Sequence, residues 1–231
     1  MNYAMEQPIA IRASESERAA FIRRTYAHLA GAILALIGLE AILLRLPGVE
    51  ELVRTMITGY SWLVVIGLYM GASWLANMWA HSETSRGVQY LGLGVYTVAI
   101  GFVFLPLLFI AKEYYPSAIP TAGILTLMVA GGLTGAVFVT RKDFSFLGPI
   151  LFVGMLLAFG FIVAGVLFKF DLGLVFCFAM VALLSGYILY YTSNVLHHYR
   201  TDQHVAASLA LFSSIATLFY YILMILMSSR E

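Results

Sequence analysis

The sequence predicts an all-α integral membrane protein with seven transmembrane helices, and three observations lead to this fold class. First, 61% of its 231 residues are hydrophobic and only 11% are charged, whereas soluble domains are about 45–50% apolar and about 25% charged. Second, the apolar residues gather in seven runs, each long enough for a span of about 20 residues. Third, the connections between the runs are short, which leaves no room for a soluble domain. Lipid must therefore surround much of the chain.

The first apolar run, 25–46, follows a polar stretch of mixed charge. This stretch lacks the basic segment and short apolar segment of a cleavable signal peptide, so we expect the first run to direct insertion. We divide the chain into a polar cytoplasmic N-terminal tail, 1–22, and a seven-helix transmembrane domain, 23–231. The remaining expected spans are 57–80, 88–111, 120–140, 146–168, 172–196 and 206–227.

Rows of small residues mark three of these spans. Gly67 and Gly71 lie four residues apart in the second span, as do Gly131 and Gly135 in the fourth. The seventh span carries Ala206, Ala210 and Ser214, with Thr217 further along the same face. Such rows allow helix backbones to approach closely in lipid. Compact packing within one bundle is our main interpretation, and a homo-oligomer is the alternative.

The basic residues predict the orientation, because Lys and Arg are enriched on the cytoplasmic side of membrane proteins. With the N-terminus inside, the cytoplasmic side carries Arg12, Arg18, Arg23, Arg24, Arg86, Arg141, Lys142 and Arg200. The other side then carries Arg45, Arg54, Lys112, Lys169 and Arg230. The excess predicts a multi-pass protein of a plasma membrane with the N-terminus in the cytoplasm and the C-terminus outside.

A polar face marks the end of the sixth span. Tyr187, Tyr191, Asn194 and His198 are spaced at i, i+4, i+7 and i+11, which places them on one helix face. Lipid cannot satisfy these groups, so they must face other protein or a water-filled cavity. This face is a candidate lining for a pore.

All five histidines fall on the predicted cytoplasmic side. Interfacial residues that hydrogen-bond lipid headgroups are one interpretation, and a proton-sensing mouth is the other, since histidine titrates near neutral pH. No two histidines are four residues apart, which argues against a metal site on one helix. The five are His28, His81, His197, His198 and His204.

Two further residues lie inside apolar runs. Glu40 is a possible intramembrane carboxylate, either a cation or proton ligand or a group that reaches the outer headgroups or a neighbouring helix. Cys177, the single cysteine, excludes an intramolecular disulfide and is expected to be a buried small hydrophobe. Hydrolase and metalloprotease motifs are missing, so we expect no enzyme, no metal and no cofactor. A net charge of +1 without a basic stripe predicts no nucleic-acid partner.

Several segments resemble one known family. The loop Val137–Gly148 reads VFVTRKDFSFLG, with Arg141, Lys142, Asp143 and Phe144 at its centre. Together with GYILYYTSN at Gly186–Asn194, this loop resembles the signature of the Bax inhibitor-1 family. The segments Phe21–Ala32 and Ala207–Leu226 extend the resemblance from the first span to the last. The loop and the short ending, in which the TSN motif is followed by a loop and the last helix, are most similar to the bacterial YccA-type branch.

The resemblance implies six helices packed around a central C-terminal helix, and one of two activities. Some members are pH-dependent calcium leaks governed by paired aspartates on the last two helices. YccA-type members are inner-membrane proteins that associate with the FtsH membrane protease and modulate it. At the two aspartate positions this chain has Tyr191 and Ser214, which cannot supply that charge at neutral pH. We therefore expect a neutral hydrogen-bonded seam of Tyr187, Tyr191 and Asn194 with Ser213, Ser214 and Thr217.

These observations predict a non-enzymatic bacterial inner-membrane protein that modulates an FtsH-like protease in membrane-protein quality control. A pH-dependent calcium or cation leak between the last two helices is the alternative. A helix bundle that scaffolds other membrane proteins is a third.

Overall fold

The computed structural model of the protein describes residues 8–82 and 85–229. Arg230 and residues 1–7 of the predicted tail lie outside this part of the chain. Within it, seven helices are long and apolar enough to cross a membrane, which confirms the predicted fold class. They are α1 (Glu15–Leu43), α3 (Ser61–Ala80), α4 (Arg86–Tyr114), α5 (Ala118–Thr140), α6 (Gly148–Phe168), α7 (Gly173–His197) and α8 (His204–Ser228).

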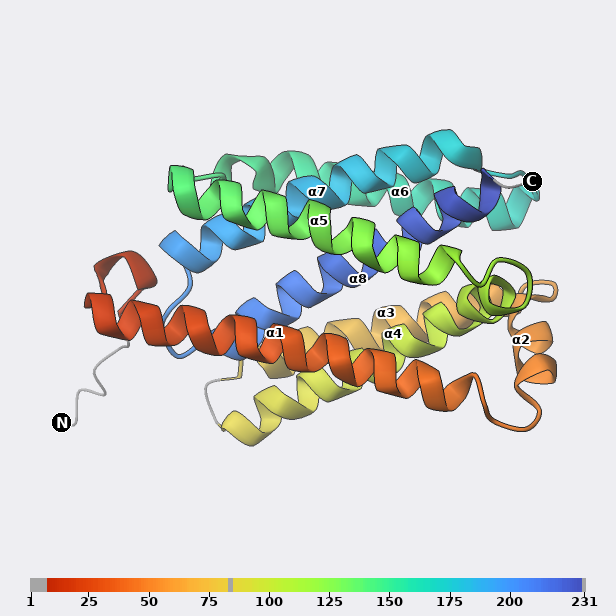
Figure 1. The fold of residues 1–231 in the computed structure, drawn as a ribbon, viewed down its shortest axis with the longest axis horizontal. Helices are drawn as coiled ribbons and strands as arrows, with labels where there is room; N and C mark the ends of the chain where they lie inside the picture. The colour runs from red at the N-terminus through yellow and green to blue at the C-terminus, as the bar shows by residue number, and fades with distance from the viewer. Residues whose placement is uncertain (1–7, 83–84, 230–231) are drawn as a thin grey trace.

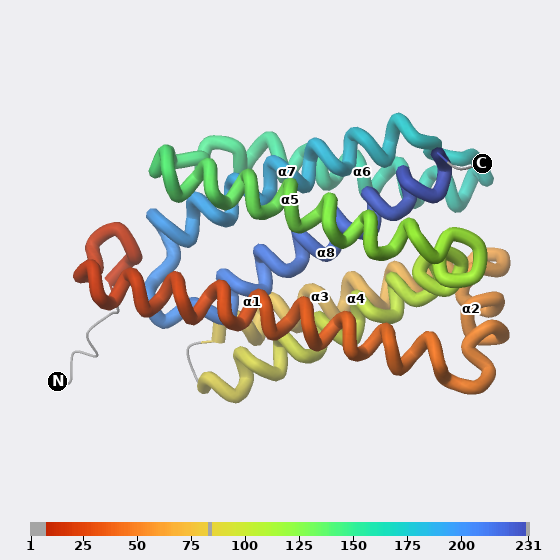
Figure 2. The backbone as a smooth tube through the Cα atoms, viewed as in Figure 1, coloured from red at the N-terminus to blue at the C-terminus, as the bar shows by residue number. Residues whose placement is uncertain are grey.

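The helices form two layers with the last helix between them. In Figure 1, α5, α6 and α7 make one layer, α1, α3 and α4 make the other, and α8 runs obliquely between the two. The tube in Figure 2 shows the same arrangement. The beginning of α1, the end of α3, the beginning of α4 and the α5–α6 and α7–α8 connections lie at one end, which we call the N-terminal side.

The C-terminal helix is central because other helices cover it along most of its length. In the most apolar 18-residue stretch of α8, 56% of the residues are buried inside the protein, whereas the corresponding stretches of the other spans are 11–44% buried. Helices α1, α3, α4, α5 and α7 pack closely against α8, and α6 packs mainly against α7. Five of the six helices expected around α8 thus pack closely against it, and the main partner of α6 is α7.

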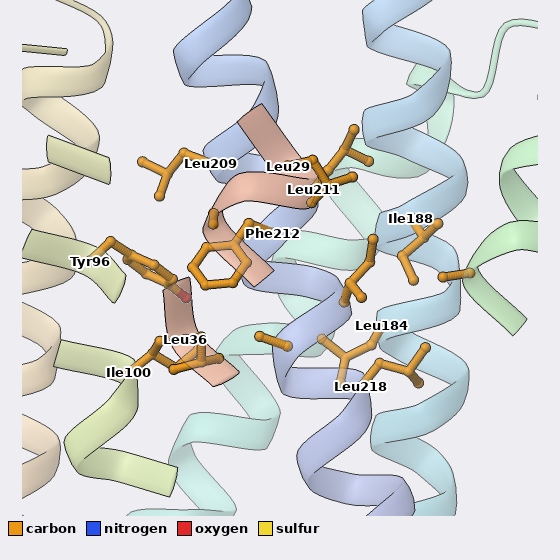
Figure 3. Packing of buried hydrophobic residues seen from close by; sticks show 14 of the residues in the cluster. Leu29, Leu36, Tyr96, Ile100, Leu184, Ile188, Leu209, Leu211, Phe212 and Leu218 are labelled. Carbon is orange, nitrogen blue, oxygen red and sulfur yellow. The ribbon is translucent and has the colours of Figure 1, made fainter. Parts of the chain in front are cut away.

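Large apolar side chains hold the two layers to α8. Phe212 of α8 is fully buried, and its ring lies edge-on to Tyr96 of α4 at 5.8 Å. On the other side of α8, Leu218 lies beside Leu184 of α7 (Figure 3). The Tyr96 hydroxyl is hydrogen-bonded to the hydroxyl of Tyr69 at 2.8 Å, so this buried polar group has a partner inside the bundle.

Helices α3 and α4 approach each other closely at one glycine. A Cβ atom on Gly92 would lie 2.6 Å from the carbonyl oxygen of Ala76 and 3.0 Å from the backbone nitrogen of Ala80. Both atoms belong to the α3 backbone, which cannot move aside as a side chain can. Only glycine allows this contact.

A short helix, α2 (Val49–Ile57), lies in the α1–α3 connection at the far end from the N-terminal side. No helix was expected at this place. Val53 and Met56 are buried against Leu105 of α4, whereas Glu50 and Glu51 face solvent. The periodicity of apolar residues could have identified it, but nine residues are too few for a search based on span length.

The N-terminal segment is attached to the bundle more firmly than a polar tail would be. Ser14 and Glu17 form a capping box that begins α1, with the Glu17 amide donating to the Ser14 hydroxyl at 3.3 Å. Before it comes a one-turn helix, η1 (Ala10–Arg12). The Ala10 amide donates to the carbonyl of Tyr199 at 2.9 Å, and the Thr201 amide donates to the carbonyl of Pro8 at 3.2 Å. Much of the expected tail is therefore ordered against the α7–α8 connection.

Candidate functional site

The α5–α6 connection forms a compact loop around one aspartate on the N-terminal side. Arg141 ends α5 in the left-handed conformation, with φ 52°, and the loop then turns into a one-turn helix, η2 (Ser145–Leu147). The Ser145 amide donates to Oδ1 of Asp143 at 2.9 Å. Nε2 of His198, at the end of α7, lies 3.0 Å from Oδ2 of the same carboxylate. This carboxylate therefore connects two segments that are far apart in the sequence.

Ser193 of α7 provides the second connection to the loop. The Phe144 amide donates to the Ser193 hydroxyl at 2.8 Å, and this hydroxyl lies 3.3 Å from Oδ1 of Asp143. Nδ1 of His197 donates to the Ser193 carbonyl at 2.9 Å. Ser193 is completely buried. Ser193 was not among the expected site residues, although it lies within the TSN motif and four residues before His197.

We call Asp143, Ser193, His197 and His198 the loop–α7 cluster. Within it, the amide of Ser145 and the side chain of His198 hold the pKa of Asp143 at about 2, below its ordinary 3.8. The carboxylate is thus charged at any physiological pH. The side chains of Asp143 and His198 remain 46% and 49% exposed, so this surface pair contributes little energy on its own.

The cluster fixes the loop, and part of the loop stays exposed. Arg141, Lys142 and Phe146 are exposed; the Phe146 side chain is 65% exposed and its ring lies 6.4 Å from that of Phe144. Arg and aromatic side chains on a pre-ordered backbone are typical of protein interfaces.

The expected seam between α7 and α8 is neutral, but its hydroxyls bond differently from the expectation. Ser213 and Ser214 both donate to the carbonyl of Ala210, at 2.9 and 3.0 Å, and Thr217 donates to the carbonyl of Ser213 at 2.7 Å. Among the described residues no hydrogen bond joins Tyr191 to Ser214. Serine and threonine inside helices commonly donate to their own backbone in this way.

The tyrosines of the seam stack along α7 itself. The ring of Tyr191 lies 5.6 Å from that of Tyr187, four residues earlier, and 5.1 Å from that of Tyr190. The backbone carbonyl of Asn194 accepts the amides of His198 and Tyr199 at 2.8 and 2.9 Å. Leu184 and Ile188 of α7 are buried and lie toward α8 (Figure 3). Nothing in this contact supplies the negative charge that a calcium ion requires.

The histidines separate into three groups. His197 and His198 belong to the loop–α7 cluster. His28 of α1 and His204 of α8 lie with ring centroids 5.0 Å apart. His81 donates from Nδ1 to the carbonyl of Asn77 at 2.9 Å, near the end of α3. Within the described residues, no three His, Cys, Asp or Glu side chains come together as a metal site would need.

Glu40 lies well inside the bundle. It is 6% exposed, and neither carboxylate oxygen has a hydrogen-bond partner among the described residues. Gly101 of α4 faces it, since a Cβ there would lie 3.4 Å from Oε1 of Glu40. Such a group is costly to keep charged. Cys177 is buried, as expected.

A family model described as "Inhibitor of apoptosis-promoting Bax1" matches residues 18–231. Protein LIFEGUARD 2 from Arabidopsis thaliana is 27% identical over 216 residues, which cover 90% of this chain and 87% of the relative. Protein LIFEGUARD 4 from the same plant is 29% identical over 212 residues, covering 89% of this chain and 83% of the relative.

A bacterial relative is also similar. "Modulator of FtsH protease YccA" from Escherichia coli strain K12 is 29% identical over 178 residues, which cover 73% of this chain and 76% of the relative. The similarity to the plant proteins extends over more of this chain. The bacterial branch expected from the loop and the last helix therefore stays a prediction.

Proposed function

Because the chain belongs to the Bax inhibitor-1 family, we propose that it is a non-enzymatic membrane protein that binds and restrains an FtsH-type membrane protease. The observation that carries this proposal is the α5–α6 loop. Its backbone is fixed to α7 through Asp143 and Ser193, while Arg141, Lys142 and Phe146 stay exposed. The printed name of the Escherichia coli relative supports the identity of the partner.

Binding through this loop has a physical advantage. A loop that is ordered before binding loses little conformational entropy when a partner arrives, so more of the contact energy remains as affinity. The two basic side chains would meet an acidic surface at the membrane, and Phe146 would supply the apolar contact. A protease held in this way would be restrained by occupancy of its surface, without chemistry by this chain.

Co-purification from native membranes tests the proposal. We expect the tagged protein to co-elute with the protease, and the double variant Arg141→Asn, Lys142→Gln to lose most of the protease. Asparagine tolerates the left-handed conformation at position 141. Arg54→Ala, an exposed cation of α2 at the other end of the bundle, is the matched control. A wild-type protein that never co-elutes with the protease would defeat the proposal.

A second candidate function is a pH-dependent cation or proton leak, which Glu40 favours. A carboxylate buried in the membrane without a partner is a common feature of ion and proton pathways. Flux into liposomes between about pH 5 and pH 8 tests this candidate. We expect Glu40→Gln to abolish any flux, whereas Tyr191→Phe and Ser214→Ala test the seam. Flux that is no greater than in empty vesicles excludes the leak.

A further inference from the structure

A groove of about 530 Å³ lies between α1 and α4. Small residues open it: Ala27, Gly31 and Ala35 recur every four residues along one face of α1, and Gly94 faces them from α4. A Cβ atom on Gly31 or Gly94 would meet no atom within 4 Å. Apolar side chains line the rest, including Leu39, Leu93 and Val98. The volume is within the range of about 300–1,000 Å³ that is usual for ligand sites.

The groove has the length of one leaflet of the bilayer. Its lining on α1 extends from Ala27 near the N-terminal side to Leu39. At 1.5 Å per residue this is about 18 Å along the helix axis. Half of a hydrocarbon core of about 30 Å is about 15 Å. An acyl chain of that leaflet therefore matches the groove in length and in polarity.

One end of the groove is polar and basic. Nδ1 of His28 donates to the carbonyl of Arg24 at 2.7 Å, which leaves Nε2 to accept from the Tyr90 hydroxyl at 3.2 Å. The two rings stack with centroids 5.4 Å apart. Arg24 precedes His28 by four residues and Arg86 precedes Tyr90 by four, so each arginine lies one turn beyond the groove on the same helix face. Both arginines are exposed.

We propose that this groove is a binding site for an anionic phospholipid, with one acyl chain between α1 and α4 and the phosphate beside His28, Tyr90, Arg24 and Arg86. The two guanidinium groups attract the phosphate, and the planar fork of arginine matches its oxygens. Basic pockets between transmembrane helices are known sites for anionic headgroups. This site is separate from the α5–α6 loop, so it does not depend on the proposed protease contact.

Native mass spectrometry of the full chain in detergent tests the site, with dipalmitoyl phosphatidylglycerol and dipalmitoyl phosphatidylcholine as probes. We expect one phosphatidylglycerol to remain bound under conditions that strip phosphatidylcholine. Gly94→Leu should abolish this binding, because its side chain fills the groove without meeting the backbone. Gly132→Leu is the matched control, since a Cβ there also meets nothing within 4 Å, but on exposed α5. Arg24→Gln and Arg86→Gln should each weaken binding about fivefold.

Three results would overturn the inference. Equal retention of both lipids would show that the basic residues do not recognise the headgroup. Retention that is unchanged in Gly94→Leu would show that the lipid binds outside the groove. A dimer that disappears in Gly94→Leu but not in Gly132→Leu would show that a helix of a second copy occupies the groove. Circular dichroism and thermal unfolding of each variant separate loss of binding from loss of fold.

Discussion

Substitution of Ser193 by alanine measures how firmly the α5–α6 loop is attached to α7. The serine is completely buried and its hydroxyl accepts the Phe144 amide at 2.8 Å. Alanine removes this acceptor and leaves the amide unsatisfied. Such a loss costs about 1–3 kcal/mol, and we expect about 1–2 kcal/mol because the bond is only partly buried.

Ser214→Ala is the matched control. Ser214 is also buried, but its hydroxyl donates to the carbonyl of Ala210, which lies within α8. Its removal therefore leaves no backbone donor unpaired, and we expect a change below about 0.5 kcal/mol.

Thermal unfolding in detergent at pH 7 compares the two variants. For a chain of this size 1 kcal/mol corresponds to about 2–4 °C in Tm, so Ser193→Ala should unfold several degrees below Ser214→Ala. Asp143→Ala combined with Ser193→Ala should be less destabilising than the sum of the two, because both act on one network. Equal Tm values for the two serine variants would refute the attachment.

Three further predictions concern charge and packing. The pKa of Asp143 is lowered in the folded protein, from 3.8 to about 2. The charged carboxylate therefore contributes its full stabilisation above about pH 4, and this stabilisation disappears as the pH falls toward 2. In an acid titration, the difference in stability between the wild type and Asp143→Asn should vanish over that interval and not at neutral pH. Gly92→Ala should lower the free energy of unfolding by about 1–3 kcal/mol, because the added Cβ meets the α3 backbone. Gly94→Ala should not lower it, because a Cβ there meets nothing within 4 Å. Equal effects of the two variants in a denaturant titration would contradict the close contact at Gly92. Glu40→Leu should raise the free energy of unfolding by about 1–3 kcal/mol, because it removes a buried carboxyl group that has no hydrogen-bond partner in the described part of the chain. A free energy of unfolding below that of the wild type would indicate that the carboxylate has a partner in the membrane.

The spans could be predicted from the sequence because hydropathy is a local property. The run 172–196 became α7 (Gly173–His197), and 206–227 became α8 (His204–Ser228). The beginning of α1 at Glu15 was missed because the helix extends as a polar segment beyond the apolar run. With 29 residues, α1 is about 43 Å long, which exceeds a hydrocarbon core of about 30 Å.

The contacts between helices could not be predicted in the same way. Periodicity places Leu184, Tyr187 and Tyr191 on one face, but it does not tell which partner each side chain meets. In the structure Leu184 lies beside Leu218 of α8, whereas the ring of Tyr191 contacts those of Tyr187 and Tyr190. The hydroxyls of Ser213 and Ser214 had two possible acceptors, a neighbouring helix or their own backbone, and the second was nearer. The bond between Ser193 and Phe144 joins residues 49 positions apart, and no local pattern indicates it.

The attachment of the N-terminal segment has a consequence for biosynthesis. Ile9 pairs with Arg200 in an isolated antiparallel bridge, so a segment that precedes α1 meets its partner only after α7 has been synthesised. Contacts between such distant residues form late and slowly. A ribosome-bound chain with five or six inserted helices therefore still has this end unattached. The bridge can close only after α7 has been released, and cross-linking positions 9 and 200 in nascent chains of increasing length would time that event.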